Sequence, residues 1–177
     1  LQPHGYLLAT IHRAENTDDP RRLSNIMAAL TELAAAEPVI VPLHPRTKKI
    51  LAGSFPSLLH RERPARAGRS APPATGLEII DPVGYFDIIA LEKSARLLLT
   101  DSGGMQKEAY WLRVPCLTLR DETEWVETVA SGWNILTGAD RNRIVTAVCT
   151  FKAPAAHSPL YGDGKAAAHC LKAFFES

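Results

Sequence analysis

The segment L-L-L-T-D-S-G-G-M-Q-K-E, Leu97 to Glu108, joins an apolar run to a helical pattern through two adjacent glycines. An apolar run that ends at Asp101 and Ser102 predicts a buried strand followed by a strand-to-helix turn. Glycine lets the backbone approach a ligand closely, and the first turn of the next helix offers free N–H groups and positive potential. The segment therefore suits a phosphate group, and an ordinary tight turn is the alternative.

Short apolar runs and helical stretches alternate along the whole chain. The first long helix is marked by Asp19, which can cap it, by Pro20 at its first position, and by an apolar stripe at helical spacing. The expected strands are 6–11, 39–43, 77–80, 97–100, 115–119 and 133–136. Strands that are apolar on both sides and separated by helices indicate a parallel sheet covered on both faces. We therefore expect a doubly wound, Rossmann-like α/β domain of about six strands over residues 1–177.

Composition limits the class of protein. The 177 residues are 46% hydrophobic, enough for one domain, and the net charge of +1 gives no reason to expect nucleic acid or an anionic membrane as a partner. No apolar run approaches the roughly 20 residues of a membrane span, and the start shows no signal-peptide pattern, so we expect a cytoplasmic protein. The dispersed histidines predict no metal site. Cys116, Cys149 and Cys170 lie in expected strands or helices, where buried thiols are common, and predict no disulfide framework.

Residues 61–76, R-E-R-P-A-R-A-G-R-S-A-P-P-A-T-G, lack hydrophobic periodicity. Their proline, glycine and arginine content predicts a mobile surface loop. The arginines would suit nucleic acid, but no aromatic residue lies between them to stack on bases, so a solvated insertion is favoured.

Polar residues directly follow five of the expected strands. In open α/β sheets, ligands bind beyond the carboxyl ends of the strands, so these residues are expected to face one crevice. The segments are 12–16 (H-R-A-E-N), 44–47 (H-P-R-T), 81–85 (D-P-V-G-Y), 101–104 (D-S-G-G) and 120–124 (R-D-E-T-E). Such a crevice suits a polar, anionic ligand.

Three residues carry specific hypotheses. Ser102 can donate a hydrogen bond to a phosphate but lacks the G-x-S-x-G setting of a hydrolase nucleophile, so we interpret it as a binding residue. Glu108, one helical turn further on, can accept two hydrogen bonds from a ribose diol, although a solvated helix glutamate is the commoner case. His12 can donate to a phosphate or transfer a proton, and a structural histidine is the alternative.

Three arginines leave two interpretations open. Arg13, Arg46 and Arg120 can each bind phosphate, or they can form ordinary salt bridges with nearby carboxylates. The acidic residues available to them are Glu15, Asp121 and Glu124.

Taken together, four motifs resemble the non-hydrolysing UDP-N-acetylglucosamine 2-epimerases, enzymes of two Rossmann-like domains in a GT-B arrangement. The motifs are T-I-H-R-A-E-N at 10–16, T-D-S-G-G-M-Q-K-E-A at 100–109, P-C-L-T-L-R-D-E-T-E at 115–124 and Y-G-D-G at 161–164. They occur in the family's order and cover essentially the whole chain. The resemblance implies that this chain is the carboxy-terminal, UDP-binding half of a GT-B fold and that the amino-terminal domain is missing.

The resemblance also assigns roles to single residues. It implies that Ser102, Gly103 and Gly104 hold the UDP diphosphate and that Glu108 holds the ribose hydroxyls. His12 would stand beside the phosphates and the sugar as a catalytic residue. Further site candidates are Arg13, His44, Tyr85 and Arg120.

In the family, UDP is eliminated together with the proton on C2, a 2-acetamidoglucal forms, and UDP adds back to give the N-acetylmannosamine product. The resemblance therefore implies UDP and a UDP-amino sugar as ligands, no metal or nicotinamide cofactor, and a homodimer. The carboxylates that move the C2 proton belong to the other domain. We therefore expect this chain to be a fragment that binds UDP weakly and has no epimerase activity alone.

Two features bear on the substrate and on the missing domain. Where many members read R-D-x-T-E-R-P-E, the chain has R-D-E-T-E-W-V-E at 120–127. The alternatives are an epimerase of UDP-2,3-diacetamido sugars, a hydrolysing 2-epimerase, a GT-B glycosyltransferase donor domain and a stand-alone nucleotide-sugar binding module. A last helix over 165–175 would cross back to the missing domain, leaving its apolar residues exposed here: Ala168, Leu171, Phe174 and Phe175.

Overall fold

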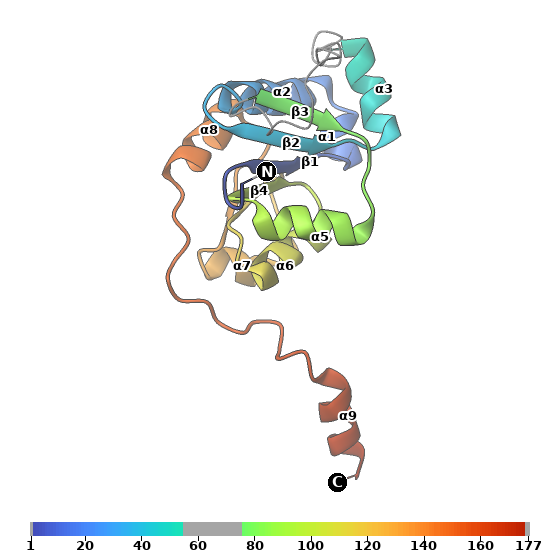
Figure 1. Cartoon of the computed structure of the whole chain (residues 1–177), viewed down its shortest axis with the longest axis vertical. Coiled ribbons are helices and arrows are strands. Elements are labelled where there is room, and N and C mark those ends of the chain that lie inside the picture. Colours follow the sequence, from blue (N-terminus) through green and yellow to red (C-terminus); the bar gives the residue numbers. More distant parts are fainter. Residues whose placement is uncertain (1, 55–75, 176–177) are drawn as a thin grey trace.

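The computed structural model describes residues 2–54 and 76–175. Its centre is a six-stranded, parallel sheet with the strand order β3-β2-β1-β4-β5-β6 (Figure 1). The strands are β1 Leu7–Thr10, β2 Pro38–Pro42, β3 Gly76–Ile80, β4 Leu97–Thr100, β5 Cys116–Thr118 and β6 Asn134–Leu136. This sheet confirms the expected Rossmann-like architecture. The loop expected at 61–76 lies outside the described residues, apart from Gly76, which opens β3.

Each face of the sheet has its own apolar core, because alternate side chains of a strand point to opposite faces. Leu7 and Ala9 of β1 and Leu99 of β4 pack on one side, whereas Leu8 and Leu98 pack on the other. All five side chains are fully buried. The central strands therefore read as continuous apolar runs, as a parallel sheet between two layers of helices requires.

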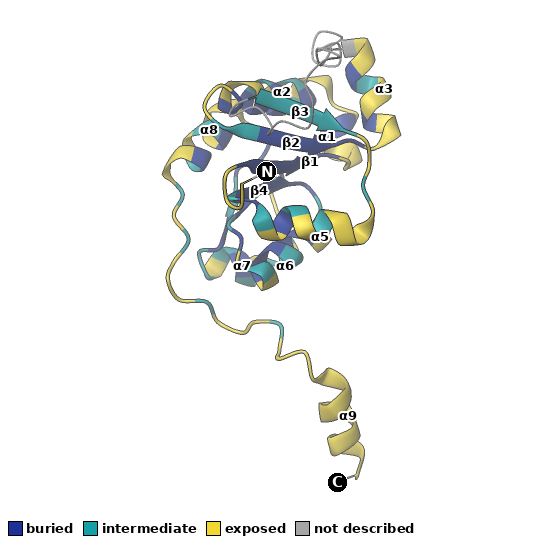
Figure 2. Ribbon diagram, viewed as in Figure 1, coloured by how far each residue is buried: buried dark blue, intermediate teal, exposed yellow. Residues whose placement is uncertain are grey.

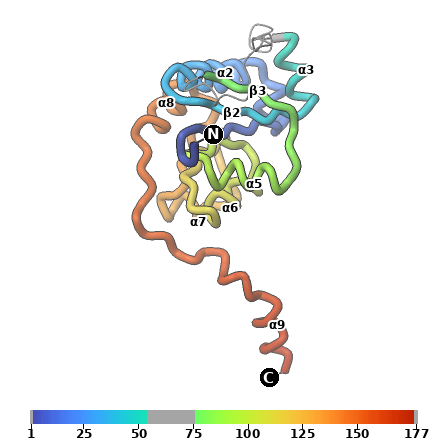
Figure 3. Tube along the Cα trace, viewed as in Figure 1, coloured from blue at the N-terminus to red at the C-terminus, as the bar shows by residue number. Residues whose placement is uncertain are grey.

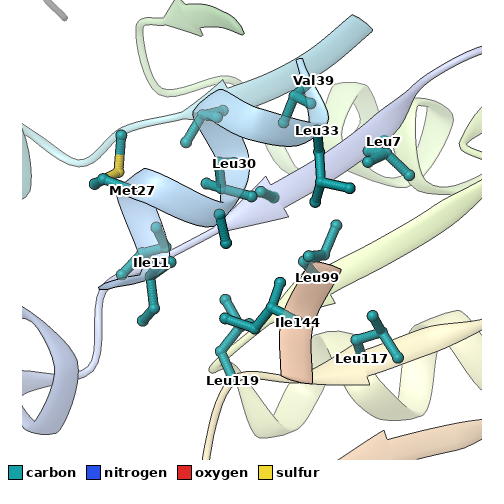
Figure 4. Packing of buried hydrophobic residues seen from close by; sticks show 14 of the residues in the cluster. Leu7, Ile11, Met27, Leu30, Leu33, Val39, Leu99, Leu117, Leu119 and Ile144 are labelled. Carbon is teal, nitrogen blue, oxygen red and sulfur yellow. The ribbon is translucent and has the colours of Figure 1, made fainter. Parts of the chain in front are cut away.

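Helices cover both faces of the sheet. The helices that the structure describes are α1 Ala14–Thr17, α2 Pro20–Leu33, α3 Pro45–Ser54, α5 Tyr85–Ser94, α6 Gly103–Leu112, α7 Val126–Ala130, α8 Arg141–Thr150 and α9 Ala166–Phe175. α2 and α8 pack together over one face, where Met27, Leu30 and Ile144 meet side chains from the strands (Figure 4). α5, α6 and α7 lie on the other face, where Met105 and Ala109 join the second core (Figure 1).

The start of α2 follows from two residues. The side chain of Asp19 accepts hydrogen bonds from the backbone N–H groups of Arg21 (2.8 Å) and Arg22 (3.3 Å), and Pro20 lies in the first turn. The cap satisfies N–H groups that no helical carbonyl can reach. The predicted apolar stripe is buried at every position: Leu23, Ile26, Met27, Leu30, Leu33 and Ala34.

The C-terminal helix α9 stands apart from the sheet (Figures 1 and 3). It has no buried residue, and Leu171, Phe174 and Phe175 are 58%, 81% and 83% exposed (Figure 2). The predicted exposure of its apolar residues, Ala168 included, is confirmed. In the part of the chain that the structure describes, no helix has both the length and the apolar character needed to cross a membrane.

The cysteines differ in their surroundings. Cys116 is buried in β5, whereas Cys149 on α8 and Cys170 on α9 are exposed. The expectation of buried thiols is therefore wrong for two of the three. Ile144 and Val148 turn one face of α8 to the core. Cys149 lies about 100° further round that helix, and α9 has no buried face at all.

Candidate functional site

The candidate site lies at the carboxyl ends of the strands, where the strand order reverses. β1 and β4 are neighbours in the sheet, but the chain continues from β1 to β2 on one side and from β4 to β5 on the other. In such a topology the crevice between the two strands is the usual ligand site. His12 follows β1 and Asp101 follows β4, so the H-R-A-E-N and D-S-G-G segments meet here.

Contacts between the polar segments confirm that the strand ends converge. Each contact joins residues that follow different strands. The contacts are Asn16–Asp101 (3.1 Å), Arg13–Glu124 (3.6 Å), Arg120–Glu15 (3.9 Å) and Lys48–Asp81 (2.9 Å). The segments that follow the strands therefore lie along one edge of the sheet.

Asp101 joins the ends of β1 and β4, a role that sequence analysis did not assign. Its buried side chain accepts hydrogen bonds from the backbone N–H groups of His12 (3.1 Å) and Arg13 (3.1 Å) and from the side-chain amide of Asn16 (3.1 Å). The same amide donates to the carbonyl of Leu119 (2.9 Å), just past β5. A carboxylate is tolerated in the interior only where N–H groups surround it. These donors lie 85 to 89 residues away in the sequence, so no local pattern revealed them.

The turn formed by Ser102, Gly103 and Gly104 begins α6. The Ser102 hydroxyl makes no capping hydrogen bond to the helix. Gly103 is buried, and a Cβ there would lie 2.5 Å from Oε1 of Glu124. Gly104 is exposed, and a Cβ there would have the Ser102 hydroxyl, 3.9 Å away, as its nearest neighbour. Gly103 therefore makes room for the loop that carries Glu124, whereas Gly104 keeps the start of the helix open to a ligand.

Glu108 lies one helical turn beyond Gly104 and is held by Tyr85 of α5. The Tyr85 hydroxyl donates a hydrogen bond to Oε1 of Glu108 at 3.1 Å. This bond, together with the charge of Glu108, raises the pKa of Tyr85 above its ordinary value. The structure therefore brings these two candidates together on the α5–α6 side of the site, where Tyr85 orients the carboxylate.

The candidate arginines form ion pairs, Arg13 and Arg120 with carboxylates that the sequence analysis named and Arg46 with one that it did not. Arg120 is only 12% exposed, and its guanidinium pairs with Glu124 at 2.7 Å. A backbone hydrogen bond and then Arg120 hold the pKa of Glu124 below its ordinary value. Arg13 pairs with the same carboxylate at 3.6 Å, and Arg46 pairs with Asp18 at 2.8 Å. Of the three arginines, Arg13 therefore has the longest distance to its nearest carboxylate.

The two candidate histidines lie at different strand ends. His12 is exposed after β1, and its backbone is fixed by Asp101. His44 follows β2, and its Nδ1 accepts a hydrogen bond from the backbone N–H of Arg46 (3.3 Å) at the start of α3. His12 therefore faces the reversal point of the sheet, whereas His44 caps a neighbouring helix. Within residues 2–54 and 76–175, no three His, Cys, Asp or Glu side chains gather as metal ligands would.

An aromatic cluster beside α6 was missed by sequence analysis. The ammonium group of Lys107 lies 5.0 Å from the ring centroid of Trp111, 4.6 Å from that of Trp125 and 4.7 Å from that of Tyr161. Such cation–π contacts are attractive. Trp125 occupies the position of the arginine in the R-P pair of the epimerase pattern. The chain therefore has an aromatic ring in place of that arginine, and the ring contacts the ammonium group of Lys107. Lys107 and Trp111 are four residues apart on α6, a spacing that brings side chains together. Trp125 and Tyr161 come from separate segments, so local spacing could not predict their contacts.

Comparisons with known proteins agree with this geometry. The family model described as UDP-N-acetylglucosamine 2-epimerase matches residues 1–174. A UDP-N-acetylglucosamine 2-epimerase homolog of Methanococcus maripaludis is 46% identical over 160 residues, which are 90% of this chain and 41% of that protein. The UDP-2,3-diacetamido-2,3-dideoxy-D-glucuronate 2-epimerase of Pseudomonas aeruginosa is 45% identical over 165 residues, which are 92% of this chain and 42% of that enzyme.

A solved structure matches the fold as well. The UDP-GlcNAc 2-epimerase of Methanocaldococcus jannaschii, in complex with UDP-GlcNAc and UDP, matches 97% of this chain with a TM-score of 0.79 and 38% identity. The match covers 45% of that chain. This chain therefore spans less than half the length of the relatives that it matches, as expected for one half of a GT-B arrangement.

We predict that Asp101→Asn lowers the free energy of unfolding by about 3 kcal/mol. The amide cannot accept all the hydrogen bonds of the carboxylate, and its own N–H groups would face those of His12 and Arg13. Urea unfolding measures the loss. Asp121→Asn is the control, because Asp121 is 62% exposed and pairs with Arg22 at the surface, where such pairs contribute under about 1 kcal/mol. Equal losses in the two variants would contradict the anchoring role of Asp101.

Proposed function

Since the chain belongs to the UDP-N-acetylglucosamine 2-epimerase family, we propose that it forms the UDP-binding half of an enzyme that interconverts UDP-N-acetylglucosamine and UDP-N-acetylmannosamine. The observation that carries the proposal is the open turn at the start of α6, with the Tyr85–Glu108 pair one helical turn away. The turn suits a diphosphate, and the carboxylate suits a ribose diol. The M. jannaschii relative was solved in complex with UDP-GlcNAc and UDP, which supports UDP as the ligand.

In this proposal the diphosphate binds to Ser102, Gly103 and Gly104. The N–H groups in the first turn of α6 have no helical carbonyl to bond, and they lie at the positive end of the helix dipole. The Ser102 hydroxyl adds another donor. Glu108, oriented by Tyr85, accepts hydrogen bonds from the two ribose hydroxyls.

The proposed reaction is an elimination followed by a re-addition. The C1–O bond to UDP breaks with its electron pair going to the diphosphate, a base takes the C2 proton, and a C1=C2 double bond forms. UDP then adds back at C1 while C2 receives a proton on the opposite face. No net electrons are exchanged, so these steps require no nicotinamide. The base belongs to the domain that the longer relatives have in addition to this one.

The contribution of this chain to catalysis is to stabilise the leaving group. Fixed N–H dipoles at the start of α6 oppose the negative charge that develops on the departing diphosphate. His12, exposed at the reversal point of the sheet, donates a hydrogen bond or a proton to the same group. Because these donors are already in place, they need no reorganisation as the bond breaks.

A second substrate is a candidate for the same reaction. The P. aeruginosa relative is named for UDP-2,3-diacetamido-2,3-dideoxy-D-glucuronate. It is 45% identical to this chain, and the M. maripaludis homolog is 46% identical. Offering each nucleotide sugar to the full-length protein, without any acceptor, decides between the two substrates. It also tests for a glycosyltransferase, which would require an acceptor.

We predict that the chain binds UDP and that Ser102→Ala and Glu108→Gln each weaken binding roughly 10- to 100-fold, because each removes a hydrogen bond to a charged group. Calorimetric titration of the 177-residue chain with UDP measures the loss. Glu122→Gln makes the same change of charge at an exposed position nearby and should alter the affinity less than about twofold. If Glu108→Gln behaves like Glu122→Gln, Glu108 does not hold the ribose.

We predict that Gly104→Ala separates folding from binding. Alanine favours the helix by up to about 1 kcal/mol, and the nearest neighbour of its Cβ is 3.9 Å away, so stability is kept or raised. The added methyl group, beside the Ser102 hydroxyl, obstructs the diphosphate and weakens UDP binding roughly tenfold or more. Thermal unfolding and UDP titration of the same variant measure the two effects. Unchanged UDP affinity would argue against a phosphate site at this turn.

We predict that the isolated chain shows no measurable epimerase activity, whereas a full-length protein containing it converts UDP-N-acetylglucosamine without an acceptor. The reason is that the C2 base lies outside this chain. NMR detection of UDP-N-acetylmannosamine measures turnover in both proteins. In the full-length protein, His12→Asn should lower kcat by roughly 10²- to 10⁴-fold if His12 acts as an acid. Turnover by the isolated chain would refute the division of roles.

A further inference from the structure

Glu92 is a buried carboxyl group that the proposed function does not use. It lies on α5 seven residues after Tyr85, so the two residues share one face of the helix, with Ile88 between them. Glu92 is 0% exposed, and neither of its oxygens has a hydrogen-bond partner among the described residues. Glutamate is almost never fully buried unless it is paired. An unpaired one at a helix contact therefore requires an explanation.

Several titratable groups lie around Glu92. Glu108 of α6, the Cys116 thiol of β5 and the Tyr85 hydroxyl of α5 interact with it electrostatically. From the N-terminal segment, the Tyr6 hydroxyl is engaged by the carbonyl of Leu91, at 2.6 Å. The ring of His4 bonds to the carbonyl of Ala95, at 3.2 Å. The negative charge of Glu108 disfavours a second negative charge on Glu92.

Burial raises the pKa of Glu92 to about 8, and the charge of Glu108 adds to the increase. The folded chain therefore holds Glu92 as the neutral acid at neutral pH. Glu108, which the proposed function assigns to the ribose, therefore disfavours the charged form of Glu92. The protonation of Glu92 is coupled to the charge of Glu108 in this way. α5, which carries Glu92, contacts α6, which carries Glu108, and the Tyr85–Glu108 hydrogen bond joins the same two helices.

We propose that Glu92 is a positioning residue for Glu108: as a neutral acid it fills the α5–α6 contact, so that Glu108 alone carries negative charge there, and its ionisation weakens the binding of UDP. This inference rests on the proposed function, because it assigns Glu108 to the ribose. An ionised Glu92 needs water or a cation, and admitting either one separates α5 from α6. Tyr85 then no longer orients Glu108, and the ribose loses its acceptor.

The direction of the pH effect follows from linkage. UDP binds the state in which Glu92 is neutral, so bound UDP raises the pKa of Glu92 further. UDP affinity is therefore highest below about pH 8 and falls as the pH rises through the pKa of Glu92. Where Glu92 is partly ionised, binding of UDP takes up protons.

The first measurement is a carboxyl ¹³C NMR titration of Glu92 in the 177-residue chain, assigned by its absence in Glu92→Gln. In the free protein we expect a midpoint of about 8. In Glu108→Gln we expect a midpoint lower by roughly half a unit, because one negative charge is removed. A midpoint near 4.5, or one that Glu108→Gln leaves unchanged, overturns the inference without any reference to UDP.

The second measurement is calorimetric titration with UDP at about pH 6.5 and about pH 9.5, on either side of the transition. We expect the wild-type affinity to fall by up to about tenfold, as a rise of one pKa unit on binding implies. The terminal phosphate and the uracil N–H of UDP titrate in the same way for every variant, so the readout is the difference between variants. Glu92→Gln, a neutral isostere, should lose less affinity between the two pH values than the wild type, whereas the control Glu122→Gln should keep the wild-type pH dependence.

The outcomes separate the inference from the function on which it rests. Wild-type binding that is equally tight at both pH values, or a Glu92→Gln variant that keeps the wild-type pH dependence, overturns the role of Glu92 and leaves the UDP site intact. A chain that binds no UDP at either pH overturns the proposed function, and the role of Glu92 at the ribose with it, even if the ligand-free titration shows the coupling.

Discussion

The buried carboxylate of Asp101 holds together the two strand ends between which the candidate site is built. Its N–H donors follow β1, whereas Asp101 follows β4, so one side chain closes the reversal point of the sheet. Asn16 extends these hydrogen bonds to the carbonyl of Leu119. An interior carboxylate without such donors is strongly unfavourable, so the loss of any one of these hydrogen bonds destabilises the fold. The position of His12 relative to Ser102 depends on it.

The positive potential of the site comes from the backbone more than from cationic side chains. Arg13 and Arg120 share the carboxylate of Glu124, so part of their charge is already balanced. These ion pairs also hold the loop after β5 against Gly103, which has no side chain to obstruct it. What remains open is the start of α6, where N–H groups and the helix dipole favour an anion. N–H donors that are fixed in a helix bind an anion in one position only. This suits a ligand whose phosphates must stay in place while a bond breaks.

The cation–π cluster gives a structural role to the residue at which the chain departs from the commoner epimerase pattern. Trp125 contacts the ammonium group of Lys107, and its indole nitrogen would lie 3.3 Å from a Cβ at Gly103. Tyr161, from the Y-G-D-G motif, joins the same cluster, so the segment after α8 is fixed on α6 before α9 begins. The motif at the end of the sequence therefore supports α6 from outside.

Much of the architecture was predictable from local patterns, because strand runs, helix caps and helical periodicity depend on residues close together in the chain. Asp19 and Pro20 marked the start of α2, and the apolar run ending at Thr100 marked β4 and the edge where polar residues gather. The partners of those polar residues were not predictable. The donors of Asp101 and the ion pair of Arg13 with Glu124 join segments far apart in the sequence, and the burial of Glu92 depends on how α5 packs. Such contacts depend on how helices pack on a particular sheet, and only the folded chain brings their atoms together.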